Sequence, residues 1–165
     1  MGEKLSGAHV SEEVILRKGT NNDFTKPGDD FIAPEKRPLI TEKKYEAQCI
    51  KTEKAYSHSS SRKIFLHFKI VDWMNFDDPP VLFMAMNDPG SKPSAGTKYY
   101  QNWVIANGNK MPERGDRMST RIFLNGMFEV YVETVRPKFP DGEEKPECFH
   151  YSIVRYIKRR LAGAN

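Results

Sequence analysis

Acidic side chains are the first candidates for chemistry in this sequence. Asp72, Asp77, Asp78 and Asp88 lie within one short stretch, and carboxylates grouped in this way can hold Mg²⁺ in a metal-dependent nuclease. The same residues flank predicted turns, where Asp is favoured because its side chain accepts hydrogen bonds from nearby backbone amides. We favour the turn interpretation and keep the nuclease as an alternative.

A second acidic segment, residues 140–145, has the letters PDGEEK and superficially matches a restriction-type nuclease signature. In that signature the Pro-Asp element and the acidic pair come from separate strands, whereas here they share one loop. The sequence contains no GxSxG, P-loop or GxGxxG motif, and its two cysteines, Cys49 and Cys148, form no CxxC. Its four histidines are scattered. We therefore expect a non-enzymatic protein with no cofactor and no structural metal.

Basic and aromatic residues suggest binding rather than catalysis. Lys63, Phe65, His67 and Lys69 alternate with apolar residues, so a strand at this position presents one basic and aromatic face. Single-stranded nucleic acids bind such faces because cations neutralise phosphates and bases stack on exposed rings. The neighbouring predicted loops add residues of the same types. The predicted nucleic-acid site consists of Lys54, Tyr56, Arg62, Lys63, Phe65, His67, Lys69, Arg136, Lys138 and Phe139.

The elements that must position these residues follow from the hydrophobic pattern. Period-two alternation predicts strands over residues 44–52, 63–70, 81–86, 128–134 and 149–157, with loops at 53–61 and 137–146. A helix is expected between an N-cap at Thr97 and a left-handed C-cap at Gly108, with Tyr100, Trp103 and Val104 in the core. This order favours a five-stranded OB-like barrel with one helix between strands 3 and 4. A mixed β-sandwich is the alternative.

Composition sets the domain boundaries. The chain has 165 residues with 38% hydrophobic residues, which suffices for one domain. We predict a partly flexible N-terminal tail at 1–41, the barrel at 42–160 and a C-terminal tail at 161–165. Of the net charge of +4, residues 1–43 contribute −1 and residues 44–165 contribute +5. A basic excess in the folded part suits a polyanionic partner.

Three segments resemble the small OB-fold single-stranded DNA-binding proteins of phages, plasmids and integrative elements. Residues 63–72 resemble their basic and aromatic strand that ends in Asp, residues 125–132 a turn leading into their fourth strand, and residues 151–157 their last strand. The chain differs from bacterial housekeeping single-strand binders because it ends in KRRLAGAN rather than an acidic tail. The resemblance implies DNA rather than RNA as the ligand, and a role in replication or recombination of a mobile element.

We therefore expect a single-stranded DNA-binding protein that uses aromatic stacking and phosphate contacts. The alternative is a protein-interaction module, an inhibitor or adaptor of a nucleic-acid enzyme, whose partner docks on the same face. Phe65 could also be covered by the N-terminal tail or by a second copy in a homo-oligomer. Since no apolar run reaches membrane-spanning length and the N-terminus lacks a signal-peptide pattern, we expect a cytoplasmic protein without membrane contact.

Overall fold

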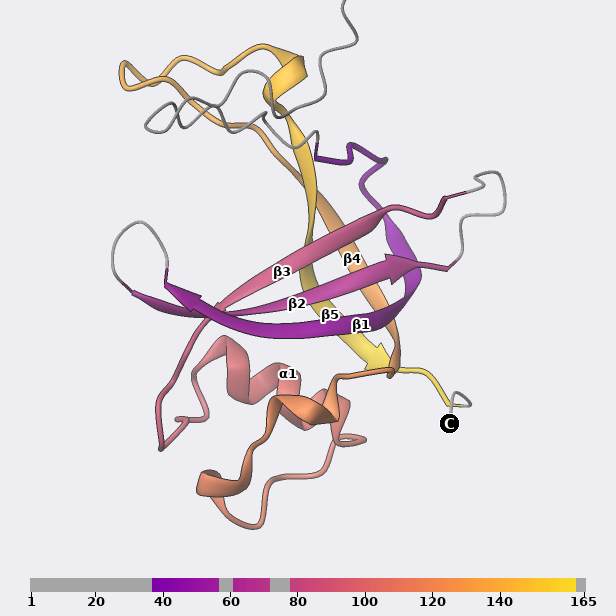
Figure 1. The fold of residues 1–165 in the computed structure, drawn as a ribbon, viewed down its shortest axis with the longest axis vertical. Coiled ribbons are helices and arrows are strands. Elements are labelled where there is room, and N and C mark those ends of the chain that lie inside the picture. Colours follow the sequence, from indigo (N-terminus) through magenta and orange to yellow (C-terminus); the bar gives the residue numbers. More distant parts are fainter. Residues whose placement is uncertain (1–36, 57–60, 72–77, 163–165) are drawn as a thin grey trace, which may run out of the picture. The chain divides into compact units, whose positions relative to one another are not determined.

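The computed structural model describes residues 37–56, 61–71 and 78–162, which are mainly β (Figure 1). The strands are β1 (Lys44–Tyr56), β2 (Arg62–Ile70), β3 (Val81–Asn87), β4 (Met127–Val135) and β5 (Tyr151–Arg160). Helix α1 (Lys98–Ala106) lies between β3 and β4, and short 3-10 helices occupy Gly115–Arg117, Thr120–Ile122 and Glu147–Phe149. The predicted order of five strands with one helix between the third and fourth is confirmed.

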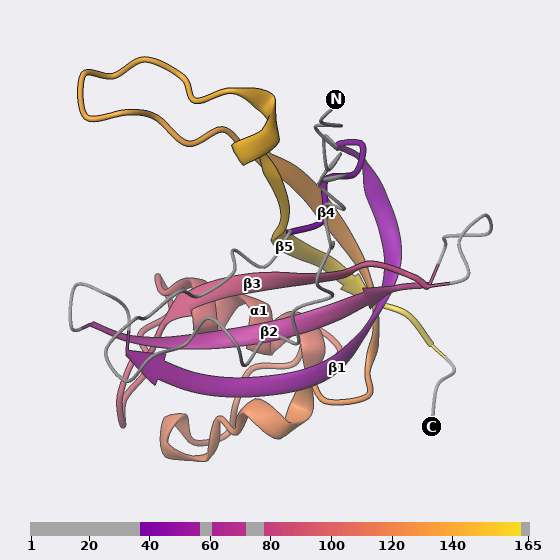
Figure 2. The same ribbon diagram turned by 45° about the horizontal axis from the view of Figure 1, so that its top comes forward.

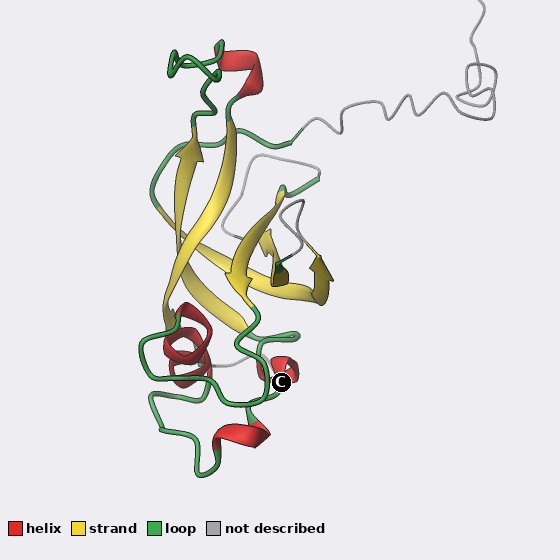
Figure 3. Cartoon of the chain, turned by 90° about the vertical axis from the view of Figure 1, so that its left-hand side faces the viewer, coloured by secondary structure: helices red, strands yellow, loops and turns green. Residues whose placement is uncertain are grey.

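All five strands belong to one antiparallel sheet in the order β3-β2-β1-β4-β5. Strand β1 is central: residues 44–48 pair with β4 and residues 47–56 with β2, so Ala47 and Gln48 have a partner on each side. The sheet is strongly curved (Figure 3) and brings Phe83 of β3 to Tyr151 of β5, with ring centroids 6.4 Å apart. Within the described residues the edge strands β3 and β5 are not paired, so the sheet is not closed.

The inner face of the sheet carries the hydrophobic core, as the alternation in β2 predicts. Ile64, Leu66, Phe68 and Ile70 are at most 1% exposed, and the Phe68 ring meets Phe128 of β4 edge-on at a centroid distance of 6.1 Å. Burying one such side chain contributes roughly 1.5–3 kcal/mol. Because successive residues of a strand point to opposite faces, the basic and aromatic residues of β2 lie on its outer face.

Strand β1 contains a bulge that changes which side chains face outward. Its register against β2 passes from the pair Cys49–Phe68 to the pair Lys51–His67, which leaves Ile50 as the extra residue. A one-residue insertion inverts the two faces of the strand that follows it. Strand β1 also continues to Tyr56, four residues beyond its predicted end, so residues 53–56 of the predicted loop are a paired strand.

Helix α1 has the predicted caps. The Thr97 hydroxyl accepts a hydrogen bond from the Tyr100 backbone N–H at 3.2 Å, and Gly108 after the helix has a φ of 70°, which favours glycine. The caps define a short helix on the inner side of the β1-β2-β3 layer (Figure 1).

The buried stripe of α1 differs from the prediction. Trp103 is in the core as expected, but Tyr100 and Val104 are only half-buried. The stripe differs because the polar residue Asn102 faces the core. Its Oδ1 accepts a hydrogen bond from the Ile157 backbone N–H of β5 at 3.2 Å. A prediction that counts only apolar residues cannot identify a buried asparagine. The buried residues of the helix are Tyr99, Asn102, Trp103 and Ala106.

Residues 37–40, which we call the N-terminal strap, attach to β5. The Ser152 N–H donates to the Pro38 carbonyl at 2.8 Å, the Ile40 N–H donates to the Ser152 hydroxyl at 2.9 Å, and that hydroxyl donates to the Ile40 carbonyl at 3.1 Å. Ile40 also packs against the core. The compact unit comprises residues 36–165 and includes strap residues that the sequence assigned to the tail; residues 1–36 lie outside the described residues.

Candidate nucleic-acid interface

The outer face of β2 presents the four residues on which the sequence-based prediction mainly depends. Lys63, Phe65 and His67 are half-buried and Lys69 is exposed, whereas each residue between them is buried. The structure therefore places these four side chains on one face, as the alternation predicted.

Two further aromatic residues extend this face across the strands. Phe65 and Phe83 have ring centroids 6.0 Å apart at an interplanar angle of 57°, and Phe83 and Tyr151 are nearly parallel at 22°. We call Phe65, Phe83 and Tyr151 the ring row, because they come from β2, β3 and β5 in turn. The Arg37 guanidinium of the strap lies over this row, 4.5 Å from the Tyr151 ring centroid and 5.7 Å from that of Phe83.

Charged groups border the ring row. Lys63 donates a hydrogen bond to the Asn87 side-chain oxygen, and Lys69 has no ion-pair partner among the residues that the structure describes. Across β2, the carboxylate of Glu53 contacts Lys51 at 2.5 Å and His67 at 3.0 Å. Hydrogen bonds from Lys51 and from His67 lower the pKa of Glu53, which therefore stays ionised at neutral pH.

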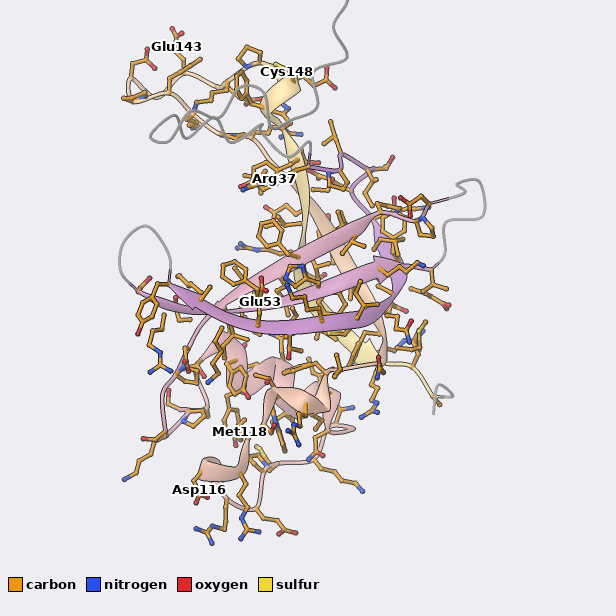
Figure 4. The ribbon with its side chains drawn as sticks, in the orientation of Figure 1. Arg37, Glu53, Asp116, Met118, Glu143 and Cys148 are labelled. Atoms are coloured by element: carbon orange, nitrogen blue, oxygen red, sulfur yellow. The ribbon has the colours of Figure 1, made fainter. Side chains whose placement is uncertain are left out.

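Glu53 thus places a negative charge within the candidate site. In Figure 4 it lies on the side of the sheet opposite to Met118 and Asp116, and in the register it pairs with Phe65 of β2. This placement follows from the bulge, which brings Lys51 and Glu53 to the outer face.

Three predicted site residues lie on the face opposite to Phe65: the bulge in β1 places Lys54 and Tyr56 there, and the alternation of β2 places Arg62 there. Lys54 pairs with Ile64 of the inner face, and both Lys54 and Arg62 contact the Asp88 carboxylate, at 3.4 and 3.1 Å. Tyr56 is 74% exposed at the end of the same hairpin. Lys54 and Asp88 line a cavity of about 300 Å³ together with Tyr99 of α1 and residues 118–120. Lys54, Tyr56 and Arg62 therefore do not share a face with Phe65.

The predicted site residues Arg136, Lys138 and Phe139 lie in the arm, residues 136–150, which joins β4 to β5. The arm extends from the ends of these strands away from α1 (Figures 1 and 2). The Lys145 ammonium lies 5.3 Å from the Phe139 ring centroid and 5.7 Å from that of Phe149. The base of the arm leads directly into Tyr151 of the ring row, which begins β5.

Two of the acidic residues considered at the outset, Asp88 and Asp141, accept hydrogen bonds from backbone amides nearby in the chain. The Asp88 side chain is 2% exposed and also accepts the Gly90 N–H at 3.1 Å, and Asp141 accepts the Glu143 N–H at 3.0 Å, as expected for turns. Asp72 and Asp77 lie outside the described residues. Within the described ranges, no cluster of three or more His, Cys, Asp or Glu residues could hold a metal ion.

The basic C-terminal part of β5 is paired with acidic residues of β4. Lys158 and Arg159 contact the Glu129 carboxylate at 3.2 and 2.8 Å, and Arg155 contacts Glu133 at 3.2 Å. Hydrogen bonds from Lys158 and Arg159 lower the pKa of Glu129. Arg155 thus has a carboxylate of its own, whereas Lys158 and Arg159 share one. All three cations lie on β5, beside β4 and not on the outer face of β2 and β3, so the candidate site does not include them.

The sequence-based prediction missed five residues of the outer face. Strand β3 is apolar on both sides, so its alternation could not show that Phe83 points outward, although Phe83 lies directly opposite His67 in the register. Tyr151 and Arg37 were missed because their positions depend on how β5 and the strap meet β3. The complete set of missed residues is Arg37, Lys51, Glu53, Phe83 and Tyr151.

Within the described ranges, no helix has both the length and the apolar character needed to cross a membrane. Neither a protein-family model nor a curated protein matches the chain.

Proposed function

We propose that this chain is a non-enzymatic, OB-like protein that binds single-stranded DNA on the outer face of β2 and β3. The strand order, the central position of β1 and the helix between β3 and β4 support the OB-like assignment. The approach of Phe83 to Tyr151 supports it further, because a barrel of this order brings β3 and β5 together. A role in replication or recombination of a mobile element stays a prediction from the resemblance.

The observation that carries this proposal is the ring row bordered by lysines. Bases can stack on Phe65, Phe83 and Tyr151 whatever their identity, and each stacked base contributes roughly 1–3 kcal/mol. Lys63 and Lys69 lie on the same strand as Phe65 and can neutralise phosphates on either side of it. A base pair hides the faces of its bases within the duplex stack, so the row favours single strands.

Fluorescence anisotropy of labelled oligo(dT) tests the proposal. We expect binding in the micromolar range or tighter at low salt, with affinity that falls as salt rises. The double variant Lys63→Ala, Phe65→Ala should bind about tenfold more weakly or worse, since it lacks one stacking ring and one cation for a phosphate. Its melting temperature, followed by circular dichroism, shows whether the fold is retained.

The matched control is Lys138→Ala, Phe139→Ala, which removes the same residue types from the arm. Because Lys138 and Phe139 lie in the arm and not on the outer face of β2 and β3, this variant should bind nearly as well as the wild type. Absence of oligo(dT) binding at low salt would contradict the proposal, as would equally tight binding of a duplex of the same length. Oligo(U) in parallel tests the expected preference for DNA.

A protein-interaction module is the second candidate, because the arm exposes two rings. Phe139 and Phe149 are 41% and 53% exposed, and four acidic residues lie between Pro140 and Phe149. If the arm docks a protein, a pull-down should recover one stoichiometric partner that survives moderate salt. The variant Phe139→Ala should then fail to recover that partner, while oligo(dT) binding is absent.

A further inference from the structure

The contact between Arg37 and the ring row has consequences for how a strand would bind, if the proposed function holds. The guanidinium lies over both Tyr151 and Phe83, so it covers ring surface that a base would need. Arg37 itself is exposed and has no carboxylate partner among the residues that the structure describes. Its positive charge is therefore available to a phosphate.

The strap keeps Arg37 beside the row. Three hydrogen bonds join Pro38 and Ile40 to Ser152, a buried residue that follows Tyr151 directly in β5. The backbone adjacent to Arg37 is therefore fixed to the strand that carries one of the rings. The Arg37 side chain can therefore move off the rings while its backbone stays beside them.

The relative strengths of the two contacts favour an exchange. A cation over an aromatic ring at an exposed position contributes about 0.5–1 kcal/mol, whereas a base stacked on a ring contributes roughly 1–3 kcal/mol. A base can therefore displace the guanidinium from Tyr151 and Phe83. The displaced guanidinium is stabilised more by a phosphate than by solvent, because it can form paired, charge-assisted hydrogen bonds.

We propose that Arg37 is an exchangeable cap of the ring row. In the free protein it covers Tyr151 and Phe83, and in the complex a base takes its place on the rings while the guanidinium binds a backbone phosphate. The strap is thus part of the binding site, and the ligand group that Arg37 recognises is a phosphodiester next to the stacked base. This inference rests on the proposed function and adds a residue and a movement to it.

Salt dependence of binding distinguishes this role from simple packing. For single strands, the slope of log K against log[NaCl] decreases in magnitude by about 0.7 for each phosphate that the protein no longer neutralises. With the full-length chain and labelled oligo(dT) between 50 and 300 mM NaCl, Arg37→Ala should show this decrease. Arg37→Lys keeps the charge and should retain the wild-type slope. The matched control Arg114→Ala removes an arginine that pairs with Asp116 and should also retain the wild-type slope.

Nuclear magnetic resonance tests the movement directly. Protons of the Arg37 side chain should be shifted upfield by the rings in the free protein and should lose this shift when oligo(dT) is added. An unchanged salt slope in Arg37→Ala, or a ring-induced shift that persists in the complex, overturns the inference and leaves the proposed function intact. If the wild-type chain binds no oligo(dT), both the proposed function and the inference fail.

Discussion

Glu53 is the residue whose replacement should strengthen binding rather than weaken it. Its carboxylate holds Lys51 at 2.5 Å and His67 at 3.0 Å, directly beside Phe65 in the candidate site. A phosphate that approaches Lys51 must displace this carboxylate and also meets its negative charge. Glu53→Gln keeps the shape of the side chain and removes the charge.

The size of the effect follows from the exposure of the pair. The side chain of Glu53 is 38% exposed and that of Lys51 is 60% exposed, and exposed ion pairs contribute about 0.2–1 kcal/mol. Without the Glu53 charge, the binding free energy of a phosphate at Lys51 should become more favourable by up to about 1 kcal/mol, which corresponds to roughly fivefold tighter binding. If Lys51 then neutralises one additional phosphate, the salt slope should steepen by about 0.7.

Anisotropy titrations of labelled oligo(dT) at 50, 100 and 200 mM NaCl measure both quantities. The matched control is Glu113→Gln, which changes the net charge by the same amount at an exposed position of the connector between α1 and β4. We expect Glu53→Gln to bind two- to fivefold more tightly than this control at 50 mM salt, with the difference shrinking as salt rises. Equal affinity of the two variants, or weaker binding by Glu53→Gln, would refute the assignment of Glu53 to the site.

Two further predictions concern stability and are independent of nucleic acid. Asn102→Ala leaves the buried Ile157 N–H without its acceptor, so urea denaturation should show a destabilisation of about 1–3 kcal/mol; a value below about 0.5 kcal/mol would contradict this role. Burial raises the pKa of the Cys49 thiol from 9.0 to about 12, so the unfolded state ionises first and the free energy of unfolding should fall as pH rises from 9 towards 12. The slope should approach about 1.4 kcal/mol per pH unit once the pH has passed 9. Urea denaturation between pH 8 and about 9.5 should show almost no fall in Cys49→Ala, because Tyr99, whose pKa is raised from 10.0 to about 12, lowers the free energy of unfolding only as the pH reaches and passes 10.

The parts of the fold that were predictable are those that depend on local pattern. The alternation in residues 63–70 identified both the core face and the outer face of β2, and the caps at Thr97 and Gly108 identified the helix. Each of these signals acts within a few residues, because side-chain period and capping geometry are local properties.

The remaining site residues depend on non-local geometry. The bulge at Ile50 has no distinctive residue type, yet it exchanges the faces of the residues after it, so Glu53 rather than Lys54 lies beside Phe65. Phe83 and Tyr151 come together only because the sheet curves. Sequence reasoning could therefore identify the strand that carries the site, but not the composition of the whole face.

The central position of β1 also determines when the core can be completed during synthesis. The three-stranded meander of β1, β2 and β3 ends at Asn87, and within it each strand pairs with the next one along the chain. The partners of its inner face, such as Phe128 and Ile157, belong to the last quarter of the sequence. A ribosome-bound chain that ends before β4 therefore exposes the apolar face of β2 to water, and the first half of β1 has no β4 partner until Met127–Val135 has been added.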